Sequence, residues 1–178
     1  KGDDSYFRTK VELEDGEYEY KFKVRSLSWF LESDEWVDIV DPYAVNIAPE
    51  TQNGSITIKD GEVIVDDYVW MHDDKPLPAD HELVVYELHV GDFSGGEDDA
   101  DARGKYQDVI DKLDYLVDLG INAIELMPIT ENPGEYSWGY SPQHFFAVES
   151  NYGSTDELKH LIDECHGKGI RVILDGIY

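Results

Sequence analysis

The sequence is poor in several residue types, and each shortage excludes a class of protein. Cys165 is the only cysteine among 178 residues, so no disulfide can form within the chain. Lys and Arg number 14 against 40 Asp and Glu, and the resulting net charge of -26 repels nucleic acid phosphates and anionic lipid. No apolar run approaches membrane-spanning length. We therefore expect neither nucleic acid nor membrane as a partner. The charge suits a neutral substrate, or simply a well-hydrated surface in a saline habitat.

The two ends of the sequence indicate a piece of a longer chain. It opens in a polar run, KGDDSYFRTK, without an initiator Met, and it stops at what we interpret as the tip of a strand. No signal peptide is recognisable, but with the true start expected elsewhere, both a cytoplasmic and a secreted location stay open.

The first 65 residues carry the pattern of antiparallel strands. Apolar side chains alternate with charged ones, which is typical of a strand buried on one face. The apolar positions are Tyr18, Tyr20, Phe22 and Val24. Segments 55–59 and 63–65 flank Asp60-Gly61, a pair that favours the two-residue turn of a hairpin. We predict a partial β-sandwich over residues 1–65.

Two further features of the N-terminal half bear on its organisation. Residues 66–82 contain two prolines and many Asp without any period, and they predict a linker. Before them the chain is dense in aromatic residues, namely Trp29, Phe30, Trp36 and Tyr43. These rings could stack on sugars, or they could serve as core and inter-domain packing, and the sequence leaves both interpretations open.

From residue 83 onwards, strands and helices alternate. Apolar runs predict strands at 83–90, 121–127 and 170–174, and we interpret the last as a strand buried on both faces. Strands that alternate with helices pair in parallel, with a crossover between each pair. The sequence therefore predicts an α/β region over residues 83–178.

Two helices are predicted between these strands. The apolar stripe of residues 105–119 consists of Tyr106, Val109, Ile110, Leu113, Leu116 and Val117. The stripe of the second helix consists of Leu158, Leu161, Ile162 and Cys165. Gly120 is placed to end the first helix, and Ser154 and Glu157 have the capping-box spacing that begins the second. A long loop, from Pro128 to about Gly153, precedes the second helix.

The candidate site lies at the end of the last strand. Asp175 ends that apolar run, at the sheet edge where α/β enzymes hold their active-site loops. The long loop contains Tyr136, Trp138 and Tyr140, which we expect over the same edge. Aromatic rings beside a carboxylate suit a sugar, because C–H bonds stack on the rings and the acid accepts from hydroxyls. We predict that these four residues bind substrate. The alternatives are an apolar plug and a carboxylate that only accepts backbone hydrogen bonds.

Other signals for chemistry are weak. His160, Cys165 and His166 lack the spacing of a metal site, and Cys165 lies on an apolar helical face that favours a buried thiol. Neither a phosphate-binding glycine loop nor a nucleophilic serine elbow is recognisable in the sequence. We therefore expect no metal site and no cofactor in these residues.

Several motifs in one order resemble the α-amylase superfamily, glycoside hydrolase family 13. They are VVYELHVGDF, GINAIELMPI and the run from SWGYSPQHFFAVESNYGS to VILDGIY, and together they cover residues 83–178. Asp175 resembles the first residue of the family motif Asp-x-Val-x-Asn-His, with Ile177 in place of Val. Gly139-Tyr140 resembles the Gly-Tyr whose ring stacks on sugar. Residues 16–44, which include GEYEYKFKV and DPYA, more weakly resemble the end of a starch-binding module.

The resemblance implies strands one to three of a (β/α)8 TIM barrel that acts on α-linked glucans with retention of configuration. The family places its nucleophile and acid/base after later strands, so we expect no catalytic residue in this chain, and Asp175 to support and bind. A structural calcium in the full-length protein is compatible with the family. The resemblance favours an α-amylase-like hydrolase of starch, glycogen or maltooligosaccharides. The alternatives are a branching or debranching enzyme and a non-catalytic glucan-binding protein.

Overall fold

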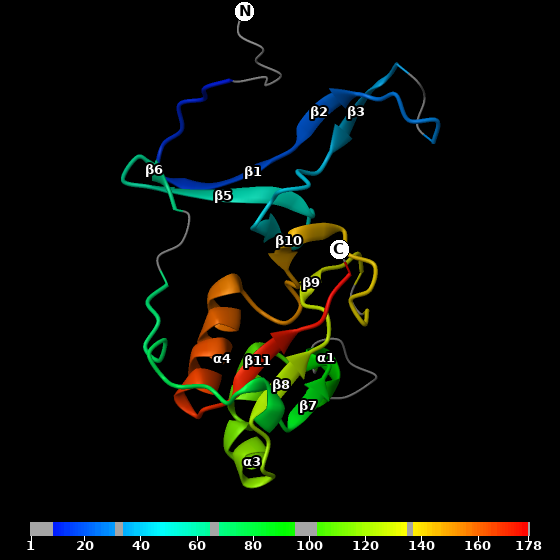
Figure 1. Ribbon diagram of the computed structural model, residues 1–178. Helices are drawn as coiled ribbons and strands as arrows, with labels where there is room; N and C mark the ends of the chain where they lie inside the picture. The colour runs from blue at the N-terminus through cyan, green and yellow to red at the C-terminus, as the bar shows by residue number, and fades with distance from the viewer. Residues whose placement is uncertain (1–8, 31–33, 65–67, 95–102, 135–136, 178) are drawn as a thin grey trace, which may run out of the picture.

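The chain has two parts, as Figure 1 shows: antiparallel strands from the N-terminal half, and a parallel sheet with its helices from the C-terminal half. The computed structural model describes residues 9–30, 34–64, 68–94, 103–134 and 137–177. The strands are β1 (Gly16–Tyr20), β2 (Phe22–Arg25), β3 (Trp36–Ile39), β4 (Ile47–Ala48), β5 (Asn53–Lys59), β6 (Glu62–Val63), β7 (Val85–Leu88), β8 (Ala123–Leu126), β9 (Thr130–Glu131), β10 (His144–Val148) and β11 (Arg171–Leu174). The helices are η1 (Asp80–Glu82), α1 (Val90–Phe93), α2 (Tyr106–Ile110), α3 (Leu113–Asp118) and α4 (Thr155–Gly167).

The predicted hairpin of the N-terminal half is formed by β5 and β6. The turn residues Asp60 and Gly61 have φ values of 55° and 77°, the left-handed conformation that favours this residue pair. The Asp15 carboxylate accepts hydrogen bonds from both turn N–H groups, at 2.9 and 3.0 Å. β5 also pairs antiparallel with β1 and β4, and β1 shows the expected alternation of half-buried and exposed residues.

The single strand that the alternation predicted through Val24 is wrong, because the chain divides there into β1 and β2. β1 pairs with β5 as far as Tyr20, which lies opposite Gly54, and the Tyr20 ring fills the space that a Cβ on Gly54 would need. The pairing of β1 with β5 ends at this point, and β2 pairs with β3 in a separate ribbon (Figure 1). Phe22, expected on the buried face, is 46% exposed in consequence.

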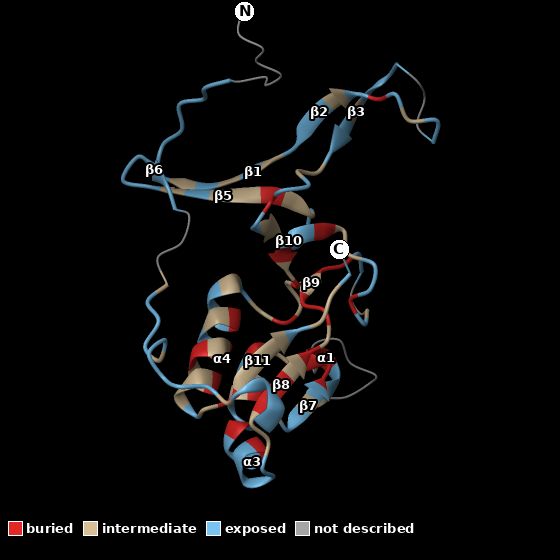
Figure 2. Cartoon of the chain, in the orientation of Figure 1, coloured by how far each residue is buried: buried red, intermediate tan, exposed pale blue. Residues whose placement is uncertain are grey.

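The C-terminal half contains a parallel sheet in the order β7-β8-β11. Tyr86, Ile124 and Val172 lie side by side across it, and the predicted alternation of parallel strands with helices is confirmed. The principal core lies where this sheet meets its helices, and Figure 2 shows the buried residues gathered there. Its fully buried members include Tyr106, Val109, Leu113, Leu116, Ile124, Leu126 and Leu161. Among the described helices, none is both long and apolar enough to cross a bilayer.

The helix ends follow the local sequence signals. Ser154 and Glu157 form the predicted capping box at the start of α4. Gly120 and Gly169, with φ of 89° and 73°, end α3 and α4 in the left-handed conformation. After each glycine the next N–H bonds a carbonyl five residues earlier, Ile121 to Leu116 and Ile170 to Cys165. Both helices therefore end in the same Schellman geometry, and in each case an isoleucine follows the glycine just before the next strand.

Two expectations about this half are corrected by the structure. The helix over 105–119 is interrupted between α2 and α3, where the Lys112 N–H bonds the Val109 carbonyl three residues back instead of four. The strand expected to be buried on both faces is only half-buried, and Leu174 is 45% exposed. Among the described strands β11 pairs on one edge only, with β8, which is itself paired on both edges and is buried at Ala123, Ile124 and Leu126.

The residues after position 67, predicted as linker, lie along α4. The buried Asp163 carboxylate accepts the backbone N–H groups of Met71 and His72, at 3.0 and 2.9 Å. The His72 ring packs within about 3.0 Å of where a Cβ on Gly167 would stand. These contacts hold the C-terminal part of the segment between the two halves against α4 (Figure 1).

We predict that these 178 residues, produced alone, expose apolar sheet surface and self-associate. In the described part, β7 and β11 each pair with β8 alone, and Val85 and Leu174 are 44% and 45% exposed. Unpaired edges beside exposed apolar residues favour association between chains. Light scattering after gel filtration should show oligomers, and a hydrophobic dye should bind. A monomer with a sharp cooperative melt and no dye binding would contradict this.

Candidate functional site

The structure brings Tyr140 and Asp175 together at the carboxyl ends of the parallel strands, as the sequence predicted. The Tyr140 hydroxyl donates to Asp175 Oδ2 at 2.6 Å, although 35 positions separate the two residues. The other oxygen, Oδ1, accepts the Gly176 N–H at 2.7 Å, so the carboxylate also has the backbone role that the alternative interpretation gave it. The backbone N–H of Asp175 donates to the Leu126 carbonyl at 2.9 Å, so Asp175 is hydrogen-bonded to the end of β8.

The charge around Tyr140 keeps its hydroxyl neutral. The hydrogen bond to Asp175, followed by partial desolvation and the negative charges of Asp175, Glu87 and Glu125, raises the pKa of Tyr140 to about 12. Tyr140 is 39% exposed, so part of the residue remains accessible to solvent. The pair therefore offers an aromatic surface and carboxylate lone pairs at one place.

The chain around Tyr140 is held tightly at its neighbours. Gly139 has φ of 88°, and a Cβ there would stand 2.6 Å from both the Cβ and the carbonyl oxygen of Pro128. Only glycine fits this position, where the loop presses against the end of β8. On the other side, the Ser141 N–H donates to Asn132 Oδ1 at 3.2 Å.

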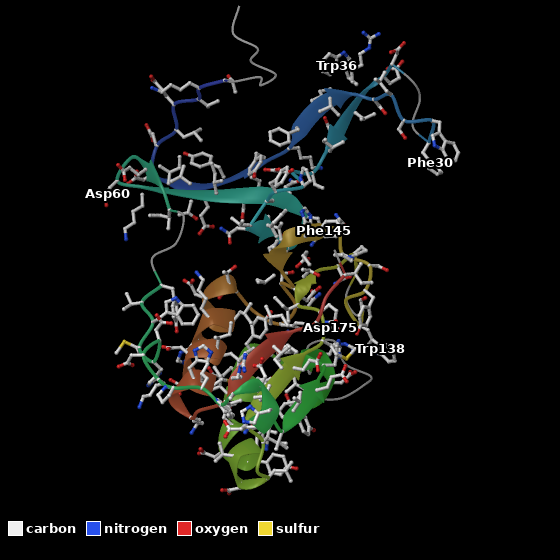
Figure 3. The ribbon with its side chains drawn as sticks, viewed as in Figure 1. Phe30, Trp36, Asp60, Trp138, Phe145 and Asp175 are labelled. Carbon is white, nitrogen blue, oxygen red and sulfur yellow. The ribbon has the colours of Figure 1, made fainter. Side chains whose placement is uncertain are left out.

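Of the other two predicted site residues, Trp138 and Tyr136, the structure describes only Trp138. Trp138 is 60% exposed and lies on the same side of the parallel sheet as Asp175, the side that faces the N-terminal strands (Figure 3). Tyr136 lies outside the residues that the structure describes. The long loop that carries them contains an antiparallel pair, β9 with β10, which the sequence analysis missed.

His89 is a site-supporting residue that the sequence analysis also missed. It directly follows β7, is 7% exposed, and places Nε2 3.0 Å from the Ser137 carbonyl and 2.7 Å from the Tyr152 hydroxyl. It thus contacts the backbone one residue before Trp138. Its position at a strand tip, like that of Asp175, is the signal that could have identified it.

The N-terminal aromatic residues divide between the two interpretations. Trp29, Phe30 and Trp36 are 83%, 78% and 63% exposed, so core packing is wrong for them, and a sugar-stacking role stays a prediction. Figure 3 shows Phe30 and Trp36 at the far end of the N-terminal strands from Asp175. Tyr43 is also 73% exposed, but it stacks on Phe146 of β10 with ring centroids 5.6 Å apart, which is a contact between the two halves at the surface.

The remaining candidates for chemistry do not form a centre. In the described part of the chain, no group of three or more His, Cys, Asp and Glu could hold a metal ion. Cys165 is fully buried, as predicted, and burial raises the pKa of its thiol to about 12. A thiol in this state is a poor nucleophile.

Comparison with known proteins agrees with this geometry. Residues 89–178, about half of the chain, match the family model of the alpha amylase catalytic domain. A malto-oligosyltrehalose trehalohydrolase of Saccharolobus solfataricus is 36% identical over 82% of this chain and 24% of its own length. A 1,4-alpha-glucan branching enzyme of Salinibacter ruber is 33% identical over 89% of this chain and 25% of its own. The chain thus spans about a quarter of the length of these relatives.

Solved structures give the same result. A putative alpha amylase from Salmonella typhimurium matches 79% of this chain and 22% of its own, with TM-score 0.64 and 32% identity. Pullulanase type I from Bacillus subtilis, complexed with maltose, matches 80% and 23%, with TM-score 0.63 and 31% identity. The catalytic-domain match and the amylase-like structures support a protein of a TIM-barrel class. Within that class, the chain belongs to the alpha-amylase family, glycoside hydrolase family 13.

We predict that Asp175→Asn lowers the pKa of Tyr140 from about 12 towards its ordinary value of 10.0, because the variant removes the hydrogen bond to a carboxylate and with it the negative charge that favours the neutral phenol. A raised pKa also means that the stabilisation by this contact is complete below pH 10 and is lost as the pH rises through about 12. Tyrosinate absorbance, with Tyr140→Phe as the subtracted reference, reports this one residue. An unchanged titration in Asp175→Asn would show that the two side chains do not interact in solution.

Proposed function

We propose that this chain is the N-terminal part of a retaining enzyme that acts on α-linked glucans. The Tyr140–Asp175 hydrogen bond at the carboxyl ends of the parallel strands is the observation that carries the proposal. The relatives' names support it, since they include a trehalohydrolase, branching enzymes and a pullulanase complexed with maltose. In this proposal residues 83–178 supply strands one to three of the barrel, residues 1–65 part of a β-sandwich module, and residues 66–82 the connection.

The proposed role of the site is to bind one glucose unit. The Tyr140 ring provides a flat apolar face for the C–H bonds of the sugar, and Trp138 extends the aromatic surface. Asp175 keeps acceptor capacity beside the phenol, so it can receive hydrogen bonds from sugar hydroxyls. Asp175 binds and orients, while the reacting carboxyl groups come from later strands of the full-length protein.

The reaction itself has two candidate forms. In an α-amylase-like hydrolase, water attacks the glycosyl-enzyme intermediate, whereas in a branching enzyme the acceptor is a second glucan chain. The matches support both forms, because the branching enzyme of Salinibacter ruber aligns with 89% of the chain and the trehalohydrolase of Saccharolobus solfataricus with 82%. A further alternative is a protein of the same fold that binds glucan and catalyses no reaction.

In the full-length protein, Tyr140→Ala should lower kcat/KM on maltooligosaccharides by about 1–3 kcal/mol of transition-state stabilisation, because the stacking surface is lost. Asp175→Asn should lower activity while leaving thermal unfolding close to that of the wild type. Initial rates and melting curves on the same preparations check both effects.

The exposed aromatic Tyr115 offers a matched control for this experiment. It is 57% exposed and lies on α3, at the amino end of the β8 strand and away from the site. Tyr115→Ala should leave kcat/KM unchanged. If Tyr140→Ala and Asp175→Asn also kept the wild-type kcat/KM, the site assignment would be wrong. Binding of maltooligosaccharide without any release of reducing ends or transfer would favour the non-catalytic protein.

We further predict that these 178 residues alone do not cleave starch. Retaining chemistry needs two carboxyl groups about 5–5.5 Å apart, one as nucleophile and one that is protonated as acid. Asp175 is held by Tyr140 and by the Gly176 N–H, and a single carboxylate cannot perform both roles. A reducing-sugar assay on purified chain should match the buffer blank. Activity that persists after contaminating amylase is removed would sink this assignment.

A further inference from the structure

Asn132 is a buried polar residue directly beside the loop that carries Tyr140. It is 2% exposed, and both ends of its side-chain amide are engaged. Nδ2 donates to the Thr130 carbonyl at 2.6 Å, and Oδ1 accepts the Ser141 N–H at 3.2 Å. Asn132 therefore holds the backbone on the side of Tyr140 that Gly139 does not hold.

The position of Asn132 is in turn fixed by two buried glutamates. Its own N–H donates to Glu149 Oε2 at 3.0 Å. The residue before it, Glu131, is 1% exposed and accepts the Ser150 N–H at 2.6 Å. Burial, and then the charge of Glu131, raises the pKa of Glu149. Both carboxylates accept backbone N–H groups in the interior, so they hold this segment in one arrangement.

One bond to this segment comes from the other half of the molecule. The Gln52 side chain, just before β5, donates Nε2 to Glu131 Oε1 at 2.7 Å. Gln52 and Glu131 are 79 positions apart, so the bond joins the N-terminal strands to the β9 segment. A continuous series of contacts then runs from Gln52 through Glu131 and Asn132 to Ser141, next to Tyr140.

We propose that Asn132 is a positioning residue for Tyr140, and that the N-terminal strands help to set the sugar-binding site through the Gln52–Glu131 hydrogen bond. The inference rests on the proposed function, because it assigns a purpose to the site described there. It adds that the N-terminal half contributes to the active site through a defined side chain, apart from any glucan that it binds itself.

The decisive experiment is a double-mutant cycle in the full-length protein. Asn132→Ala should lower kcat/KM for maltoheptaose by about tenfold, since displacement of a substrate-contacting group by 1 Å can cost even more. In a Tyr140→Ala background the same change should cost no more than about twofold, because the residue it positions is already gone. Tyrosinate titration adds a reading without substrate, in which Asn132→Ala should lower the pKa of Tyr140 from about 12.

The outcomes separate this inference from the proposed function. If Tyr140→Ala alone leaves kcat/KM unchanged, the sugar site itself is wrong. If Tyr140→Ala lowers kcat/KM but Asn132→Ala lowers it by the same factor in both backgrounds, the site stands and the positioning role is overturned.

A second variant tests the link to the N-terminal strands, and it also decides the matter if Asn132→Ala does not fold. Gln52→Asn keeps an amide and suits the left-handed backbone at this position, where φ is 59°, but it is one methylene too short to reach Glu131. It should lower kcat/KM in the same direction as Asn132→Ala, by about two- to fivefold.

Asn53→Ala is the matched control, since Asn53 bonds Glu19 within the N-terminal strands at 2.7 Å and does not reach β9. It should lower the melting temperature without a change in kcat/KM. Equal kcat/KM for Gln52→Asn, Asn53→Ala and wild type would overturn the link.

Discussion

The burial of β8 between two parallel partners is the constraint on which the rest of the C-terminal half depends. Its residues pair with β7 on one side and β11 on the other in the same register. Parallel pairing brings all three carboxyl ends to one edge, so His89, Asp175 and the loop after β8 meet there without any special device. The opposite ends are held by the helix–strand turns at Gly120 and Gly169. The site is therefore a consequence of strand direction, and its chemistry is a matter of which side chains stand at that edge.

The loop after β8 is ordered by polar contacts more than by apolar packing. Glu131, Asn132 and Glu149 are nearly fully buried, and each is satisfied by backbone N–H groups or side chains around it. Such contacts are directional, so they hold a loop in one conformation where apolar packing would tolerate several. Gly139 completes the arrangement, because the absence of a Cβ lets the chain press against Pro128. Tyr140 consequently projects from a backbone that is held on both sides.

The features that could be predicted from the sequence are those encoded by local patterns of residues. The stripe on α4, the capping box at Ser154 and the glycine after each helix depend on neighbours three to five positions apart, and the structure confirms them. The stripe predicted over 105–119 is divided between α2 and α3, and its member Val117 is 42% exposed. The approach of Tyr140 to Asp175 came from the family resemblance as well as from strand direction. The bonds that no local pattern encodes were missed. Gln52 to Glu131 spans 79 positions, and Met71 to the buried Asp163 spans 92. Likewise, β1 and β2 divide where the pairing with β5 stops at Tyr20, and the alternating segment itself does not encode that point.

The negative charge of the chain bears on which ligands the candidate site can accept. Excess carboxylates give the whole surface a negative potential, and at the site Asp175, Glu87 and Glu125 act in the same direction on Tyr140. A phenol that stays neutral beside these groups can donate a hydrogen bond and present a ring, but the surrounding field opposes any phosphate or carboxylate on the ligand. A neutral polyol loses nothing in that field, and its hydroxyls donate to the acids. The same acidity that opposes nucleic acid phosphates therefore suits the uncharged glucan that we propose for the strand ends.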